Sequence, residues 1–91
     1  MDDFPHALFR LGEYYFFGQG LTRDRIKAVK YFKKAVDKNI PHGMYHLGVC
    51  YHKPYGGLKR DVEESKRLIL RAASLGIDEA QKYAHQQHWD T

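Results

Sequence analysis

A repeat of about 36 residues constrains this chain more than any other feature of its sequence. The two copies share small, aromatic and acidic residues in the same order. At an offset of 36, Leu11-Gly12 and Tyr15 recur as Leu47-Gly48 and Tyr51; at an offset of 37, Gly20-Leu21, Asp24 and Ala35 recur as Gly57-Leu58, Asp61 and Ala72. A period in this range is typical of a solenoid, in which each copy is one supersecondary unit stacked on the next.

Within each copy, the apolar residues have the spacing of a helix rather than the alternation of a strand. Leu8, Leu11 and Tyr15 fall on one face of the first half of the copy. The second halves carry matched stripes, which are Ala28, Tyr31, Phe32 and Ala35 in the first copy and Ser65, Leu68, Ile69 and Ala72 in the second. Each copy is therefore predicted to be two amphipathic helices.

Residues typical of helix ends stand at equivalent places in both copies. Asp24 and Asp61 are N-cap candidates, because a short carboxylate accepts hydrogen bonds from free amides of the first turn. Glu64, three residues after Asp61, indicates a capping box. The other pairs are Pro5 and Pro41 in first helical turns, and Asn39 and Gly76 at left-handed positions after the second helices.

These patterns predict an all-α fold, a short right-handed α-solenoid of two helix-turn-helix repeats plus a C-terminal capping helix. We expect helices at about 5–17, 24–38, 41–53, 61–75 and 78–87. The 91 residues are expected to form a single domain, 1–91, with repeats at about 5–40 and 41–76 and the capping helix at about 78–88.

Composition indicates the cellular compartment and the class of partner to expect for this domain. The single cysteine, Cys50, cannot form an internal disulfide, and the first residues lack the pattern of a secretory signal. No apolar run approaches the length of a membrane span. We therefore expect a cytoplasmic protein, with export by a signal-independent route left open. The net charge of +4 is mild, so nucleic acid is not the expected partner.

The first copy carries a recognisable family pattern: a Leu-Gly pair, a Tyr, a Gly-x-Gly turn, an Asp, and a Lys-Ala pair leading to aromatics and alanines. The strings are Leu11-Gly12-Glu13-Tyr14-Tyr15-Phe16-Phe17-Gly18-Gln19-Gly20, Asp24, and Lys27-Ala28-Val29-Lys30-Tyr31-Phe32-Lys33-Lys34-Ala35. They resemble the Sel-one-like repeat (SLR), a relative of the tetratricopeptide repeat. The resemblance implies an adaptor or scaffold protein with a concave binding face.

The second copy departs from this pattern in two places. Pro54-Tyr55-Gly56-Gly57 replaces the usual turn, and Glu64-Ser65 replaces the Lys-Ala pair. Because its loop is one residue longer, we expect the segment 53–60 to protrude and to be a place for contacts.

The leading helices of stacked pairs line the concave side, so a partner is expected on their residues that face away from the second helices. These residues are His6, Phe9, Glu13 and Phe16, then His42, Tyr45, Val49 and His52, and finally Glu79, Lys82 and Gln86. Aromatic side chains dominate the binding energy of many interfaces, so Phe9, Phe16 and Tyr45 are the leading candidates. Packing of the two Phe side chains within the core is the alternative.

The outer face of the predicted helix 24–38 carries a stripe of lysines. They are Lys27, Lys30, Lys33, Lys34 and Lys38, interrupted by Asp37. The equivalent face of the next copy mixes Glu63 and Glu64 with Arg67 and Arg71. A solvated helix face explains such a stripe, and the functional alternative is a surface for an acidic partner.

Catalysis and metal binding have little support in this sequence. Ser65 and Ser74, the only serines, fall within a helix, and the turn Gly18-Gln19-Gly20 lacks the strand that precedes a phosphate-binding loop. The spacing of His42 and His46, and of His85 and His88, places rings near one helix face, but a zinc site needs three or four converging ligands. We expect no enzyme activity, no cofactor and no native metal.

The predicted function is a non-catalytic protein-interaction module, an adaptor, scaffold or inhibitor that holds a peptide or another protein on its concave face. Its alternatives are a self-assembling fragment of a longer array, because two and a half repeats leave apolar ends, and a basic surface for acidic partners or nucleic acid.

Overall fold

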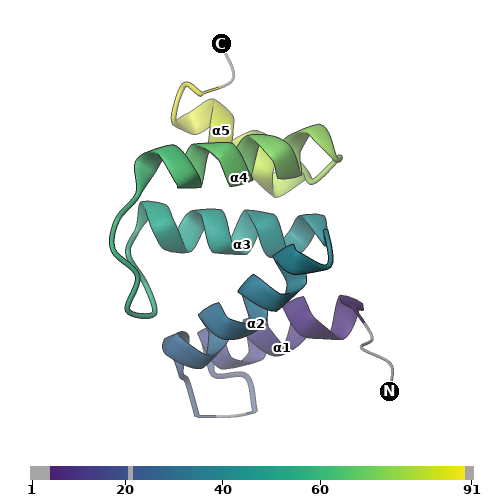
Figure 1. Cartoon of the computed structure of the whole chain (residues 1–91), viewed down its shortest axis with the longest axis vertical. Helices are drawn as coiled ribbons and strands as arrows, with labels where there is room; N and C mark the ends of the chain where they lie inside the picture. The colour runs from purple at the N-terminus through teal and green to yellow at the C-terminus, as the bar shows by residue number, and fades with distance from the viewer. Residues whose placement is uncertain (1–4, 21, 90–91) are drawn as a thin grey trace.

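The computed structural model describes residues 5–20 and 22–89, and this part of the chain forms five helices and no strand. They are α1 (Pro5–Phe17), α2 (Arg25–Asp37), α3 (Pro41–His52), α4 (Val62–Ser74) and α5 (Asp78–Gln86). Each helix packs on the next one in the chain, and Figure 1 shows the α1–α2 pair at one end of the stack and α5 at the other. The predicted all-α solenoid is confirmed, with every helix end within one residue of its expected place.

The second helix of each copy begins at its predicted aspartate cap. A carboxylate oxygen of Asp24 accepts from the amide of Lys27 at 3.0 Å, and one of Asp61 accepts from the amide of Glu64 at 3.1 Å. The predicted capping box is wrong, because the amide of Asp61 donates to the carbonyl of Tyr51 at 3.0 Å and the Glu64 carboxylate binds Arg67 at 2.6 Å instead. Only half of the reciprocal pair forms.

The ends of α2 and α4 share one backbone motif. Asn39 and Gly76 adopt positive φ angles of 59° and 95°, as predicted. The amides that follow, of Ile40 and Ile77, donate back to carbonyls five residues earlier at 3.0 and 3.1 Å. This is the Schellman arrangement, which satisfies free carbonyls and places an apolar residue against the helix it ends. Both isoleucines are buried accordingly.

The glycines of the leading helices allow the paired helices to approach closely. A Cβ atom built on Gly12 would lie 2.4 Å from the ring of Phe32, and one on Gly48 would lie 2.7 Å from Ile69. Phe32 and Ile69 are themselves 1% and 0% exposed. The repeated Leu-Gly pair therefore gives room for a large side chain from the second helix, at equivalent places in each copy.

Replacement of Ala35 by leucine should lower the thermal midpoint. A Cβ built on Gly43 would lie only 2.5 Å from the Ala35 methyl group, so α3 leaves no space for a larger side chain at that point. Overpacking of this kind costs about 1 to 3 kcal/mol. Circular dichroism melts would measure the loss, with Lys33→Leu on the exposed side of α2 as the matched control. An unchanged midpoint for Ala35→Leu would contradict this account of the α2–α3 contact.

The loop between α3 and α4 does not protrude, in contrast to the prediction. Gly56, at φ 65°, lies so close to α2 that a Cβ atom there would be 2.5 Å from the carbonyl oxygen of Arg25 and from a methyl of Val29. Tyr55 and Leu58 pack against the core. The extra residue of this loop thus lets it descend onto the start of α2, as Figure 1 shows at the left of the stack.

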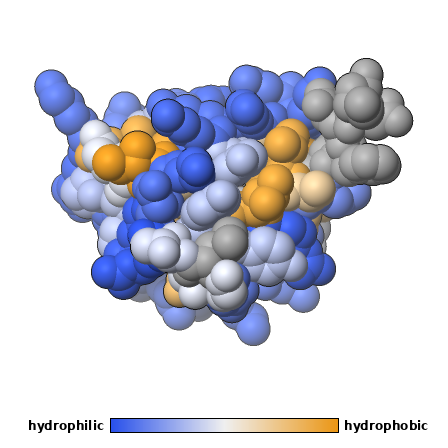
Figure 2. All heavy atoms as spheres, turned by 90° about the horizontal axis from the view of Figure 1, so that it is seen from below, coloured by the Kyte–Doolittle hydropathy of each residue, from blue (hydrophilic) through white to orange (hydrophobic). Residues whose placement is uncertain are grey.

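The first copy exposes positions that the second copy buries. Met44, Leu47, Cys50 and Leu68 are at most 5% exposed. Their repeat equivalents, which we call the end face, are Leu8, Leu11, Tyr14 and Tyr31, and all four reach solvent. No helix pair covers this end within the described residues, and Figure 2, viewed from that side, shows two hydrophobic patches separated by hydrophilic side chains.

Candidate functional site

A histidine joins the leading helices of the two copies. The Nε2 of His46 on α3 lies 2.7 Å from a carboxylate oxygen of Glu13 on α1, and its ring stacks on Phe32 at a centroid distance of 4.8 Å. Burial lowers the pKa of His46 below the ordinary histidine value, and the Glu13 carboxylate only partly opposes this effect. The ring is therefore neutral at pH 7 and donates its Nε2 proton to Glu13.

A group of four aromatic side chains lies where α3 meets α5. Tyr45 and His52 come from α3, Tyr83 comes from α5, and Trp89 follows α5; we call them the aromatic cluster. The Tyr83 hydroxyl is hydrogen-bonded to Nδ1 of His52, and the Trp89 ring meets the His52 ring edge-on at 5.2 Å. Tyr45 meets Tyr83 edge-on at 6.4 Å. All four side chains are partly exposed, so together they form an aromatic surface across two successive leading helices.

A backbone turn after α5 brings the tryptophan to this place. His88 has a positive φ of 61°, and the amide of Trp89 donates to the carbonyl of Ala84 at 2.9 Å. This is the same motif that ends α2 and α4, formed here with a histidine at the left-handed position. Trp89 consequently folds back over the end of α5 and packs against the core.

Phe9 does not belong to an exposed surface, so its predicted role as a leading contact is wrong. It is 7% exposed and packs in a small core group with Ala35 and Ile40. Its ring stacks on His42 at 4.8 Å, and His6 meets it edge-on at 6.1 Å. The reason is that Phe9 covers the turn between α2 and α3.

Phe16 likewise points away from the aromatic cluster, toward the α3–α4 loop. It is partly buried, and its ring meets that of Tyr55 edge-on at 5.2 Å. The guanidinium of Arg25 contacts both rings, 4.4 and 4.5 Å from their centroids. Cation–π contacts of this kind are stabilising. Phe16 thus anchors the loop.

The other predicted contacts are either partly buried or exposed. Val49 packs partly against the core. Glu79, Lys82 and Gln86 are exposed along α5, the helix that also carries Tyr83. The structure therefore brings the predicted contacts Tyr45 and His52 into one surface. The predicted polar contacts lie on α5, the helix that carries Tyr83. Tyr83 and Trp89 also belong to this surface, and neither was predicted from the sequence.

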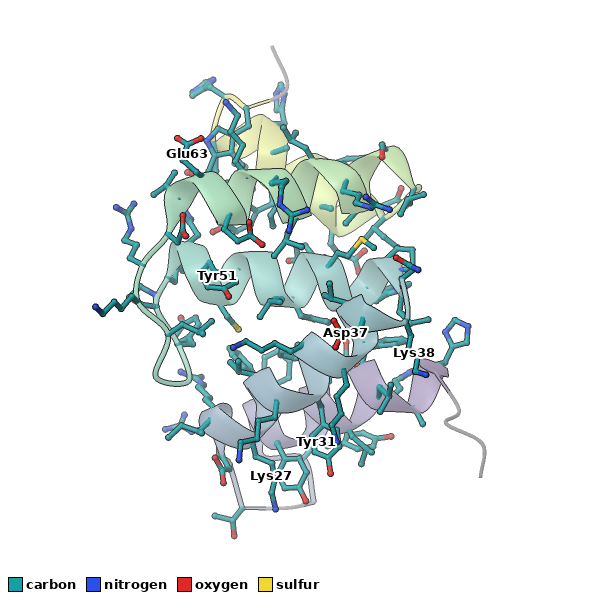
Figure 3. The ribbon with its side chains drawn as sticks, viewed as in Figure 1. Lys27, Tyr31, Asp37, Lys38, Tyr51 and Glu63 are labelled. Carbon is teal, nitrogen blue, oxygen red and sulfur yellow. The ribbon has the colours of Figure 1, made fainter. Side chains whose placement is uncertain are left out.

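The four lysines of α2 and Lys38, which follows the helix, are all exposed, as predicted from their spacing. Tyr31 and Tyr15 stack beside them with nearly parallel rings 5.7 Å apart, and the Lys27 ammonium lies 4.9 Å above the Tyr15 ring. In Figure 3, Lys27 and Tyr31 point from α2 away from α3. A hollow of about 310 Å³ lies on this surface, lined by Lys27, Lys30, Tyr31, Lys33 and Lys34.

The thiol and the two serine hydroxyls of the described residues lie within α3 and α4. Burial raises the pKa of the Cys50 thiol to about 12, which keeps it protonated. Ser65 is fully buried, and the Ser74 hydroxyl donates to the carbonyl of Arg71 at 2.8 Å. Among residues 5–20 and 22–89, no group of three or more His, Cys, Asp or Glu side chains could hold a metal ion. None of the helices there is long and apolar enough to cross a membrane.

Acidification from pH 7 to pH 5 should lower the stability of the fold. The pKa values of His46 and His52 are both below the histidine value of the unfolded chain, about 6.5, mainly because the rings are removed from water. Both rings are neutral in the folded and the unfolded chain well above that pH, so the full unfolding free energy is present there. As the pH falls through the pKa values of the folded chain, the unfolded chain binds more protons and the unfolding free energy decreases. Urea unfolding at each pH would measure it. His46→Gln should flatten the pH dependence; an unchanged slope would contradict the role of His46.

Both copies match the same known family of repeats. The profile of the Sel1 repeat matches residues 5–40 and 41–77. The chain is 44% identical over 52 residues to the ERAD-associated E3 ubiquitin-protein ligase component HRD3A of Arabidopsis thaliana, and 36% identical over 59 residues to DAP3-binding cell death enhancer 1 of Rattus norvegicus. These matches cover 56% and 65% of this chain but only 8% and 11% of the relatives, which are far longer.

Solved structures show the same arrangement of helices. A Sel1 repeat protein from Oxalobacter formigenes is 34% identical, with a TM-score of 0.78 over 84% of this chain and 31% of its own. A protective antigen of uropathogenic Escherichia coli with an SLR fold is 33% identical, with a TM-score of 0.85 over 96% and 18%. The cysteine rich protein B of Helicobacter pylori, at 24% identity and a TM-score of 0.75 over 87% and 59%, shares the fold.

Proposed function

The chain belongs to the Sel1 repeat family, and from this premise we propose that it is a non-catalytic adaptor, scaffold or inhibitor that holds a peptide or another protein on the aromatic cluster. Sel1 repeat proteins are generally protein-interaction modules. The names of two relatives, a ubiquitin-ligase component and a DAP3-binding protein, describe association with other proteins and support this role. We place the module in the cytoplasm, where the lone thiol of Cys50 stays reduced.

The aromatic cluster is the observation that carries the proposal. Productive interfaces have an aromatic centre and a polar rim. Tyr45 on α3 and Trp89 after α5 supply amphipathic rings, while Lys82 and Gln86 on α5 supply exposed polar groups. The hydrogen bond between His52 and Tyr83 holds two of the rings in place, which lowers the entropic cost of binding.

Affinity capture from the native host, followed by mass spectrometry, tests this proposal. Wild-type chain should capture a protein that the double variant Tyr45→Ala/Lys82→Glu loses by at least about tenfold. Tyr14→Ala is the matched control, because Tyr14 is 40% exposed on α1 at the other end of the stack. Phe9 is not used, because its truncation would disturb the core. Equal capture by the double variant, with an unchanged melt, would eliminate the aromatic cluster as the binding surface.

Self-assembly is the second candidate, and the end face favours it. The equivalents of Leu8, Leu11, Tyr14 and Tyr31 in the second copy are buried, so the end face has the composition of a surface that another helix pair covers. Light scattering should then give a mass above the 10.7 kDa of one chain, and Tyr14→Glu should restore the monomer. A monomeric mass at every concentration would exclude it.

A further inference from the structure

The outer face of α2 carries four lysines whose positive charge no described acidic residue neutralises. Lys27, Lys30, Lys33 and Lys34 are exposed, and none of the four forms an ion pair with a described residue. Lys38 continues the row at the end of the helix. Two of these ammonium groups rest on tyrosine rings rather than on carboxylates, Lys27 above Tyr15 at 4.9 Å and Lys34 above Tyr31 at 5.7 Å.

The second copy shows that the fold does not need this charge. The α4 residues equivalent to the five lysines are Glu64, Arg67, Leu70, Arg71 and Leu75. Glu64 and Arg67 neutralise each other at 2.6 Å, so α4 presents one net positive charge at the four positions where α2 presents Lys27, Lys30, Lys33 and Lys34. Both helices begin with the same type of aspartate cap and bury three equivalent side chains, which are Ala28, Phe32 and Ala35 in α2 and Ser65, Ile69 and Ala72 in α4. The lysines of α2 are therefore not required by helix formation or by this packing.

A hollow lies among these lysines, and Tyr31 forms part of its lining. The hollow of about 310 Å³ is lined by the stems of the lysines and by Tyr31, which is stacked on Tyr15. Ile26, in the first turn of α2, is 61% exposed. A ligand that matches this surface carries acidic groups together with apolar side chains. Protein segments can place carboxylates and apolar side chains on neighbouring residues.

We propose that the outer face of α2 binds an acidic segment of a protein partner, with carboxylates along the lysine row and an apolar side chain in the Tyr31 hollow. The row from Lys27 to Lys38 spans about 16 Å, because the eleven steps between them rise about 1.5 Å each, and this is the length of three helical turns. Asp24 and Asp37 stand toward its two ends and limit it to a short acidic segment. Exposed charge pairs are individually weak, so several must act together.

A library of random 12-residue peptides, selected on the immobilised full chain, tests this proposal. Peptides enriched on wild type should carry clustered Asp and Glu beside an apolar residue, and the variant Lys30→Glu/Lys33→Glu should lose them. The matched control is Lys59→Glu/Arg71→Glu, which makes the same change in net charge on exposed residues of the second copy. Fluorescence anisotropy of the best peptide would then be measured in 50 and 300 mM NaCl.

The expected result is at least about tenfold weaker binding to the Lys30→Glu/Lys33→Glu variant, no change for the control, and about tenfold weaker binding at the higher salt. Tyr45→Ala should bind the peptide like wild type, which separates this surface from the aromatic cluster. Selection without acidic enrichment, or enrichment that survives the α2 reversal, would overturn the proposal. Equal or tighter binding of a 20-nucleotide single-stranded DNA, or of phosphatidylserine vesicles, would overturn it in favour of a general polyanion surface.

Discussion

Replacement of Phe32 by alanine should cost about 3 to 5 kcal/mol of unfolding free energy, because a large core side chain is truncated and a cavity remains. Phe32 is 1% exposed, the largest of the fully buried side chains, and it packs against Gly12, His46 and Phe16. A chain of this length has a total stability of about 5 to 14 kcal/mol, so the variant should be close to unfolding at room temperature. Urea unfolding followed by circular dichroism measures the loss.

The control for this prediction is Ile26→Ala on the same helix. Ile26 is 61% exposed, so its truncation should change stability by no more than about 0.5 kcal/mol. If Phe32→Ala lost as little as Ile26→Ala, the contact between α1, α2 and α3 would not be centred on this ring.

Phe32 also links the fold to the surface of the leading helices. Its ring carries the stacked imidazole of His46, which reaches Glu13 on α1 and contacts the ring of Tyr45 at 5.2 Å. Loss of Phe32 would therefore release the histidine that holds the two leading helices together, and with it one neighbour of the aromatic cluster. The packing of the second helices thus supports the candidate binding surface on the first ones.

The helices were predictable because the local rules and the repeat agree. Asp24 and Asp61 cap α2 and α4, and Asn39 and Gly76 end them, all at places that the offset between the copies predicts. The repeat acts as an internal alignment, in which each local signal is seen twice. Glu64 occurs at its position in one copy only, and there the predicted capping box does not form, because its carboxylate pairs with Arg67 three residues later.

The candidate site was less predictable, because helical periodicity says which face a residue lies on but not what covers that face. Phe9 lies on the expected face of α1 yet is buried, since the turn at Ile40 and the ring of His42 close over it. The loop around Gly56 was expected to protrude, but a positive φ lets its backbone settle against α2. Both outcomes depend on contacts between segments more than 25 residues apart, or on backbone angles that spacing does not encode.

Tyr83 and Trp89 were missed for a related reason. The chain has a single tryptophan, and it follows the last predicted helix, where no glycine marks a left-handed turn. The turn forms at His88 instead, a residue that adopts this conformation less often than glycine or asparagine. The available signal was the repeat itself, because an offset of 37 aligns Trp89 with His52, one of the predicted contact positions.

Gly12→Ala should destabilise the chain by about 1 to 3 kcal/mol, although alanine is a better helix former than glycine by about 1 kcal/mol. The new methyl group would lie 2.4 and 2.6 Å from two carbons of the Phe32 ring. The ring cannot retreat, because the imidazole of His46 is stacked on it and the side chain is 1% exposed. A gain in stability, as expected for an open helical glycine, would contradict the close approach of α1 and α2.

A double-mutant cycle with Phe32→Leu isolates this contact. Leucine lacks the outer ring carbons that the Gly12 methyl would meet, so Gly12→Ala should cost less in the Phe32→Leu background by about 1 kcal/mol or more. The second copy provides the reference, since Gly48 there faces Ile69, a smaller side chain, and the overlap with a built Cβ is correspondingly milder at 2.7 Å. Additive costs would mean that the two residues do not touch. Coupling would show that the contact between position 12 and the ring of Phe32 limits how closely α1 and α2 approach each other.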